Sequence, residues 1–132
     1  MHQHIPAQSR SASGSSFWRD VALPFIESRS VEDGRRVCYA RHSHETFSIG
    51  LIDSGASAYI NGDHQCRIEA GTLVLMNPGD VHACNPIQNQ PWAYRMLYVE
   101  TRWLSELQDG LGMDGMGFRR FASIMTRDPL LQ

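Results

Sequence analysis

The sequence predicts a mainly β protein, an antiparallel barrel or sandwich, with two short helices near its C-terminal end. Three observations predict it. Short apolar and polar runs alternate between residues 36 and 100, Gly, Asn, Asp and Pro separate these runs, and helical spacing of apolar residues begins only after residue 100. The length of 132 residues fits a single domain.

Six runs in the central part are expected to form strands, because they are short, rich in β-branched and aromatic residues, and bounded by turn formers. They cover residues 36–40, 46–53, 56–60, 64–69, 72–76 and 93–100. The Asn-Gly pair at 61–62 predicts a two-residue hairpin turn, since both residue types take positive φ angles readily. The Asn-Pro-Gly-Asp sequence at 77–80 predicts a second sharp turn.

The two ends of the chain differ from this central part. Residues 1–16 are small and polar without any period, which predicts a disordered N-terminal arm. Residues 101–111 and 117–125 have the apolar spacing of amphipathic helices, with glycines between them. The expected organisation is therefore a disordered arm (1–16), a β-barrel (17–100) and a helical dimerisation or linker segment (101–132).

Composition excludes some classes of function. The formal net charge is −2, with twelve arginines, no lysine and fourteen acidic residues, so the chain lacks the basic field that attracts nucleic acid. Its three cysteines form no C-x-x-C pair, which is typical of a reducing compartment. No apolar run reaches membrane-spanning length. We therefore expect a cytoplasmic protein that does not bind DNA through this chain alone.

Three histidines are the main candidates for a functional site. In an extended strand His42 and His44 point to the same side as Ser48, whereas Glu45 points to the other side. His82 follows the turn at 77–80. The three imidazoles could form a face of three nitrogen ligands for zinc, iron, copper or nickel, with waters completing the shell. The alternative is that they line a cavity without a metal, bonded to backbone, hydroxyl groups and water.

The order of these features resembles the paired motifs of the cupin superfamily. The first motif is H-x-H at 42–44, and the second contains P-G-D-V-H at 78–82. The resemblance implies a small jelly-roll barrel whose metal is bound by two histidines and a glutamate from the first motif and one histidine from the second. That glutamate would fall at Ser48 and is absent here, whereas Cys84 could add a thiolate.

A longer resemblance is more specific. Residues 41–86, followed by 94–104, resemble the N-terminal effector-binding and dimerisation domain of AraC-type bacterial transcription regulators. This resemblance covers about residues 17–127. It implies a barrel that holds a small effector, a helical dimer interface, and a C-terminal module of two helix-turn-helix units that this sequence lacks. The predicted fold is thus a cupin-like jelly-roll β-barrel followed by two short C-terminal helices, either a sensory fragment or a free-standing relative.

The leading functional hypothesis is a small-molecule-sensing and dimerisation domain that reaches DNA only through the missing module. A small polar effector is expected in a pocket formed by His42, His44, Ser48 and His82, with Tyr94 or Arg95 according to the register of the last strand. Arginine would favour a carboxylate ligand. The expected homodimer would use the apolar stripe of one of the two helices while the other packs on the barrel. The candidate stripes are Phe118, Phe121 and Met125 in residues 117–125, and Trp103, Leu104 and Leu107 in residues 101–111.

The alternative hypothesis is a stand-alone metal-dependent cupin enzyme, a dioxygenase or an isomerase. His42, His44 and His82 would be its ligands, with an open position for substrate. No cofactor is firmly predicted. With the carboxylate missing, the sequence predicts at most zinc or nickel at low occupancy.

Overall fold

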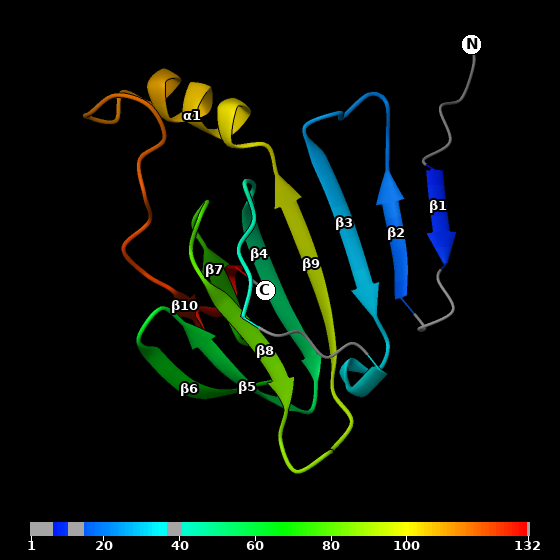
Figure 1. Ribbon diagram of the computed structural model, residues 1–132. Coiled ribbons are helices and arrows are strands. Elements are labelled where there is room, and N and C mark those ends of the chain that lie inside the picture. Colours follow the sequence, from blue (N-terminus) through cyan, green and yellow to red (C-terminus); the bar gives the residue numbers. More distant parts are fainter. Residues whose placement is uncertain (1–6, 11–14, 37–40, 132) are drawn as a thin grey trace.

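The computed structural model describes residues 7–10, 15–36 and 41–131, which form two antiparallel sheets and one α-helix (Figure 1). The larger sheet has the order β1 (Ala7–Arg10), β2 (Ser15–Arg19), β3 (Ile26–Val31), β9 (Ala93–Val99), β4 (Phe47–Ser54), β7 (Leu73–Met76) and β10 (Met125–Thr126). The smaller sheet has the order β6 (His64–Glu69), β5 (Ala56–Asn61) and β8 (His82–Pro86). Helix α1 (Thr101–Gly110) and two short 3-10 turns, η1 (Gly34–Arg36) and η2 (Pro129–Leu131), complete the described elements.

Five predicted strands are confirmed as β4, β5, β6, β7 and β9. The expected strand at 36–40 falls largely outside the described residues. Strands β3 and β8 were not predicted from the sequence, because their residues, IESRSV and HACNP, lack an apolar alternation. Both are held by long-range ladders, β3 along β9 and β8 along β5, which local sequence does not encode.

The expected disordered arm over residues 1–16 is corrected for its described part. Strand β2 pairs with β3, and β1 pairs with β2, so residues 7–10 and 15–16 belong to the larger sheet. Small polar side chains do not prevent this, because the ladder hydrogen bonds are made by backbone groups. Ser15 is in fact buried, with 1% of its surface exposed.

Only the first of the two predicted C-terminal helices forms, and it is α1. Residues 117–125 run in an extended course that ends in β10, paired with β7. Gly115 and Gly117 have positive φ angles of 102° and 67°, which interrupt a right-handed helix. Backbone groups that would be hydrogen-bonded inside a helix are instead hydrogen-bonded to side chains of other elements. The Asn77 side chain donates to the Phe121 carbonyl, and the Gln108 side chain accepts from the Arg119 N–H.

The predicted barrel is not closed within the described residues. The two sheets pack face to face and share no ladder among the residues that the structure describes. An isolated bridge joins His42, ahead of β4, to His82 in β8. Apolar side chains from both sheets fill the space between them. The buried cluster consists of Val31, Ile52, Tyr59, Ile68, Val74, Met76, Trp92, Tyr94 and Met96.

Both predicted turns are present. In the 77–80 turn, the Asp80 N–H donates to the Asn77 carbonyl at 3.0 Å, and Gly79 has a φ of 83°. The hairpin turn lies one residue later than expected, since Asn61 pairs with His64 and leaves residues 62–63 as the loop. In the part of the chain that the structure describes, no helix is long and apolar enough to cross a membrane.

Candidate functional site

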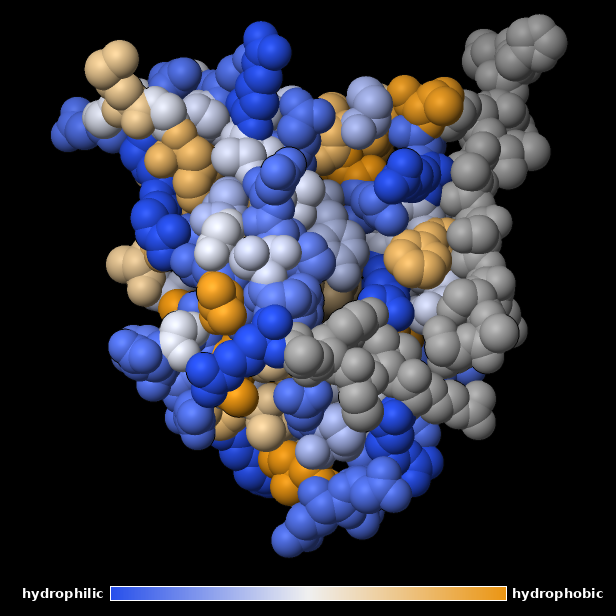
Figure 2. All heavy atoms as spheres, in the orientation of Figure 1, coloured by the Kyte–Doolittle hydropathy of each residue, from blue (hydrophilic) through white to orange (hydrophobic). Residues whose placement is uncertain are grey.

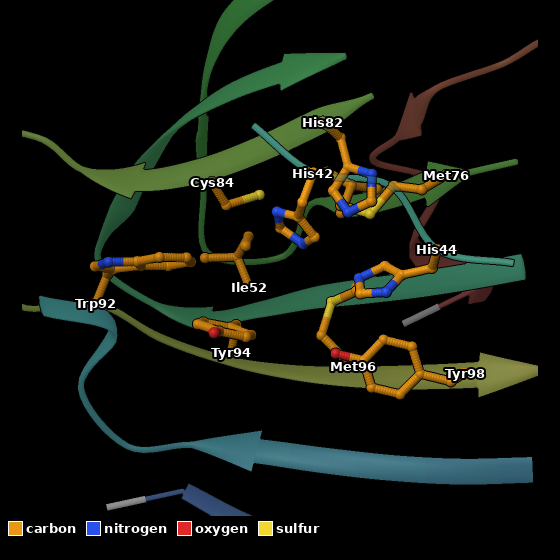
Figure 3. A pocket seen from close by; sticks show the side chains of 12 residues that line it. His42, His44, Ile52, Met76, His82, Cys84, Trp92, Tyr94, Met96 and Tyr98 are labelled. Atoms are coloured by element: carbon orange, nitrogen blue, oxygen red, sulfur yellow. The ribbon is translucent and has the colours of Figure 1, made fainter. Parts of the chain in front are cut away.

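A cavity lies between the two sheets and is lined mainly by one face of four strands (Figure 3). Even-numbered residues of β4, β7, β8 and β9 point into it, as the two-residue period of a strand requires. The lining residues are His42, His44, Gly50, Ile52, Val74, Met76, His82, Cys84, Trp92, Tyr94, Met96 and Tyr98.

The three predicted histidines come together at one end of this cavity (Figure 3). One nitrogen of each ring lies within 4.8 Å of the other two. Paired backbone hydrogen bonds between His42 and His82, at 3.0 and 2.8 Å, fix two of them. The third is fixed through the turn, because the Gly79 N–H donates to the His44 carbonyl at 2.8 Å. Backbone contacts therefore fix the main chain from which the three imidazoles project.

His82 has a defined tautomer. Its Nδ1 lies 2.9 Å from the Asp80 carbonyl, which only accepts, so Nδ1 carries the hydrogen and Nε2 keeps its lone pair. Burial lowers the pKa of His82 to about 4, although the Asp80 backbone bond opposes the shift. The pKa of His44 is also lowered, mainly by burial and to a smaller extent by the nearby His42. Near neutral pH both rings are therefore uncharged and able to bind a metal ion.

The rest of the cavity is apolar and sulfur-rich. The Trp92 and Tyr94 rings stack with centroids 4.5 Å apart, and Met76 and Met96 add thioethers. Burial raises the pKa of Cys84 to about 12, so this group is a neutral thiol and the expected thiolate is not formed near pH 7. Among the described lining residues, none carries a carboxylate, ammonium or guanidinium group.

The register of β9 decides between Tyr94 and Arg95. Tyr94 lines the cavity. Arg95 stands opposite Leu51 on the outer face, where it forms an ion pair with Asp53 at 2.9 Å and has 60% of its side chain exposed. The expectation that Arg95 could reach the pocket is therefore wrong, and the guanidinium that would have favoured a carboxylate is absent from the described lining.

Ser48 is close to the cavity but is not one of its lining residues. It stands opposite Met76 and Tyr98 in the neighbouring strands, so it shares their inward face. It is fully buried, and its hydroxyl has no hydrogen-bond partner among the described residues. An unpaired buried hydroxyl costs about 1–3 kcal/mol, so a polar group that reached it would be stabilised.

The aromatic and thioether lining was not predicted as part of the site. Trp92, Met96 and Tyr98 resemble ordinary core residues in the sequence, and Tyr94 was offered only as an alternative to Arg95. The available signal was the alternation along 92–98, in which every even position is aromatic or a methionine. This alternation shows that the four side chains share one face of the strand, but it leaves open whether they line a cavity or are packed in a filled core.

The candidate dimerisation residues do not form the expected helical stripe. Phe118 and Phe121 pack on Phe47, with ring centroids 6.0 and 4.8 Å away. Met125 lies in β10 and packs against the core. The exposed apolar side chains of α1 and the loop after it are Leu107, Leu111, Met113 and Met116. At the upper left of Figure 2, where the end of α1 lies, apolar atoms interrupt a mostly hydrophilic surface.

The size of the cavity limits what it holds without rearrangement. The space open to the centres of water-sized molecules is about 30 Å³. One water occupies roughly 10–15 Å³ on this measure, so the cavity has room for a few waters or for an ion with its waters. A wider groove of about 370 Å³ adjoins it, and Tyr98 lines both spaces.

Solved structures with a similar fold include oxalate decarboxylase from Bacillus subtilis, with a TM-score of 0.52, 12% identity, and coverage of 84% of this chain and 35% of that one. Procruciferin, an 11S globulin from Brassica napus, has a TM-score of 0.57 and 11% identity over 74% of this chain and 30% of that one. KdgF from a Halomonas species has a TM-score of 0.52 and 14% identity over 70% and 87%. At these identities the likeness shows a mainly β, cupin-like fold with one helix, and no more.

Sequence comparison is more specific. The Bacillus subtilis (strain 168) protein named uncharacterized HTH-type transcriptional regulator YbfI is 33% identical over 61 residues, which are 46% of this chain and 22% of that protein. The chain thus matches about a fifth of that relative's length. The family model of the AraC-like ligand binding domain matches residues 29–131. Because this match covers both histidine motifs and well over half of the chain, the chain belongs to the family of AraC-like ligand-binding domains.

Proposed function

We propose that the chain is the effector-sensing domain of an AraC-type transcription regulator, and that the effector is recognised at the three histidines. The observation that carries the proposal is the convergence of three imidazoles in a small cavity between two sheets. Family membership supports a small-molecule effector. DNA would be contacted by a helix-turn-helix module, which is not part of this sequence.

The donor set fits a divalent transition metal, zinc or nickel. Imidazole nitrogen is a preferred ligand of both ions, and His82 already donates its Nδ1 hydrogen to a carbonyl, as histidine ligands of metals usually do. Tetrahedral zinc at 2.0–2.1 Å from each nitrogen places the nitrogens about 3.4 Å apart. The ligand nitrogens, now up to 4.8 Å apart, would therefore close by up to about 1.4 Å around the ion. Waters or an effector atom would complete the shell.

An effector of ordinary metabolite size would extend past Tyr98. Ligand pockets usually measure about 300–1,000 Å³, far more than the cavity offers. The adjoining groove of about 370 Å³ lies in this range, and it is bordered by Phe25, Thr46 and Glu100. Rotation of Tyr98 would join the two spaces. In this proposal the histidines hold the ion or the polar head of the effector, and the groove holds its body.

Zinc binding tests the proposal directly. Wild-type protein without a histidine tag is expected to bind one zinc ion per chain in isothermal titration calorimetry near pH 7.5. His82→Ala should weaken binding at least about 100-fold, because removal of one of three ligands costs more than the 10–100-fold typical of an outer-shell partner. His64→Ala is the matched control, since His64 is exposed beside a hairpin turn. Equal zinc affinity in wild type and His82→Ala would reject the site.

A metal-dependent enzyme is the second candidate, favoured by the same three-histidine face with room for another ligand. Against it, the described cavity lining offers no carboxylate as general acid or base. Oxygen uptake by protein loaded with Fe(II), measured against a panel of small organic acids and enols, separates the two candidates. Sustained uptake that disappears in His82→Ala would favour the enzyme.

Self-association is also proposed, now through the exposed apolar end of α1. Leu111 and Met116 have 71% and 96% of their surfaces exposed, and symmetric dimers commonly bury such groups. We expect a dimer at micromolar concentration in analytical ultracentrifugation, and Leu111→Glu should weaken it about 10-fold or more, as a charge buried at an interface would. Val21→Glu is the control, because Val21 is equally exposed on the β2–β3 loop. A monomer at 100-fold higher concentration would contradict the proposal.

A further inference from the structure

Residues 118–126, which we call the strap, are held by side chains of two separate parts of the molecule. The strap runs from the loop after α1 back to the edge of the larger sheet, where β10 pairs with β7 (Figure 1). It is not helical, and its paired strand is only two residues long. Its position therefore depends on contacts from the turn at 77–80 and from α1.

The turn holds the middle of the strap. The Asn77 side chain donates to the Phe121 carbonyl at 2.9 Å and accepts from the Phe121 N–H at 2.8 Å. Asp80 forms an ion pair with Arg120, and only 11% of the Asp80 side chain is exposed. Asn77 itself is 3% exposed. Because the Asn77 amide satisfies both backbone groups of one strap residue, the strap cannot move far from the turn without leaving polar groups unpaired.

The same turn holds two of the three histidines. The Gly79 N–H donates to the His44 carbonyl at 2.8 Å, and the Asp80 carbonyl accepts from His82 Nδ1 at 2.9 Å. The Asp80 side chain also accepts from the Asn77 N–H at 3.1 Å, so the turn is internally braced. One four-residue turn thus touches the site on one side and the strap on the other.

At its other end the strap is joined to α1. Gln108, which is 2% exposed, donates to the Arg119 carbonyl at 2.8 Å and accepts from the Arg119 N–H at 2.9 Å. The Arg119 side chain pairs with Asp109 and donates to the Met113 carbonyl at 3.0 Å. The first turn of α1 has its own link to the site, because the Thr101 hydroxyl donates to the carbonyl of Glu45, the residue after His44.

We propose that the 77–80 turn and the strap transmit occupancy of the histidine site to α1 and to its exposed apolar end. The proposal rests on the function proposed above, and it adds the route by which that site is regulated. An ion that draws the imidazoles together pulls on the Gly79 N–H and the Asp80 carbonyl, so the turn moves. Asn77 and Asp80 carry that movement to Phe121 and Arg120. Coupling of this kind is reciprocal, so loosening the strap weakens binding at the histidines.

Arg120→Gln and Asn77→Ala test the route without altering a histidine. Arg127→Gln is the matched control: Arg127 pairs with Glu69 at 3.2 Å and is 56% exposed, close to the 61% of Arg120, but has no described contact with the turn. Zinc affinity is measured by calorimetry, and amide hydrogen exchange is followed by mass spectrometry with and without zinc. Nitrogen-15 NMR of the histidine rings is recorded on the metal-free proteins.

In wild type and Arg127→Gln, zinc is expected to slow exchange in residues 77–82, in the strap and in the last turns of α1. In Arg120→Gln the slowing should be confined to residues 77–82, and the dissociation constant for zinc should rise about 5-fold or more, the lower end of typical coupling. Asn77→Ala should show the same pattern more strongly. Identical affinity and exchange in Arg120→Gln, Asn77→Ala and wild type would overturn the proposal.

The NMR arm separates this proposal from the one before it. If wild type bound no zinc, the metal assignment would fail, but the coupling would still be read from the metal-free rings. The His82 ring signals should shift in Arg120→Gln and Asn77→Ala and stay unchanged in Arg127→Gln. Unchanged His82 signals in both turn and strap variants would overturn the coupling whatever zinc does.

Discussion

Replacing Trp92 with alanine is expected to lower the free energy of unfolding by about 3–5 kcal/mol, the usual cost of deleting a large buried aromatic side chain. Trp92 is 1% exposed and stacks on Tyr94 at one wall of the cavity. Its ring also packs against Gly34 so closely that a Cβ at that position would lie 2.1 Å from a ring atom. The neighbouring backbone is tied to it as well, because the Gly34 N–H donates to the Trp92 carbonyl at 2.6 Å.

Urea unfolding followed by circular dichroism measures the loss. Trp103→Ala is the matched control: Trp103 is half-buried and stacks on Phe25 with centroids 4.2 Å apart, so its removal should cost distinctly less. A loss below about 1 kcal/mol for Trp92→Ala would mean that the surrounding side chains collapse into the space. In that case the side chains that line the cavity would be able to rearrange.

Acidification of the metal-free protein is expected to remove up to about 3 kcal/mol of stability between pH 6.5 and 4, through His82 alone. Burial lowers the pKa of His82 in the folded protein to about 4, whereas the unfolded chain titrates near 6.5. Above pH 6.5 the ring is neutral in both states and contributes no pH dependence. Between the two values the unfolded chain binds the proton and the folded protein does not, so stability falls as pH falls. Below pH 4 this contribution is exhausted.

The test compares the pH dependence of the unfolding free energy in wild type and in His82→Asn. Carboxylates titrate in the same pH range, so only the difference between the two proteins is due to His82. The variant's unfolding free energy should vary less with pH from 6.5 to 4, and the two proteins should run parallel above pH 7. His44, whose pKa is also lowered by burial, adds a contribution of the same sign and remains in both proteins. Equal slopes in both proteins would show that His82 is solvated in the folded state.

Local sequence was enough for the elements that carry their own signal. The alternating run at 46–53 and the Asn-Pro-Gly-Asp turn formed as predicted, and with them the placement of His42, His44 and His82 on one side. The sequence-based prediction was wrong where residues distant in the sequence determine the structure. Whether Tyr94 or Arg95 faces the cavity depends on the register of β9 against β3 and β4. The residues at 93–100 alone do not determine that register.

The second helix failed for a related reason. Residues 117–125 have helical spacing, yet Asn77, some forty positions earlier, binds both backbone groups of Phe121. The apolar spacing that predicted a helical stripe instead places Phe121 on Phe47 and Met125 on the core. Spacing predicts which apolar residues pack on other apolar residues better than it predicts the backbone that carries them, because several backbones satisfy the same pattern.

The isolated bridge between His42 and His82 has a kinetic consequence. It spans forty positions of chain and joins two sheets whose described residues share no ladder, so we expect it to close late in folding, after each sheet has formed its own hairpins. A bound ion or effector would then stabilise the native state far more than the transition state. Such stabilisation slows unfolding and leaves the folding rate almost unchanged. Occupancy of the site would then lengthen the lifetime of the protein in the cell, because a protein that unfolds more rarely is exposed to proteases more rarely.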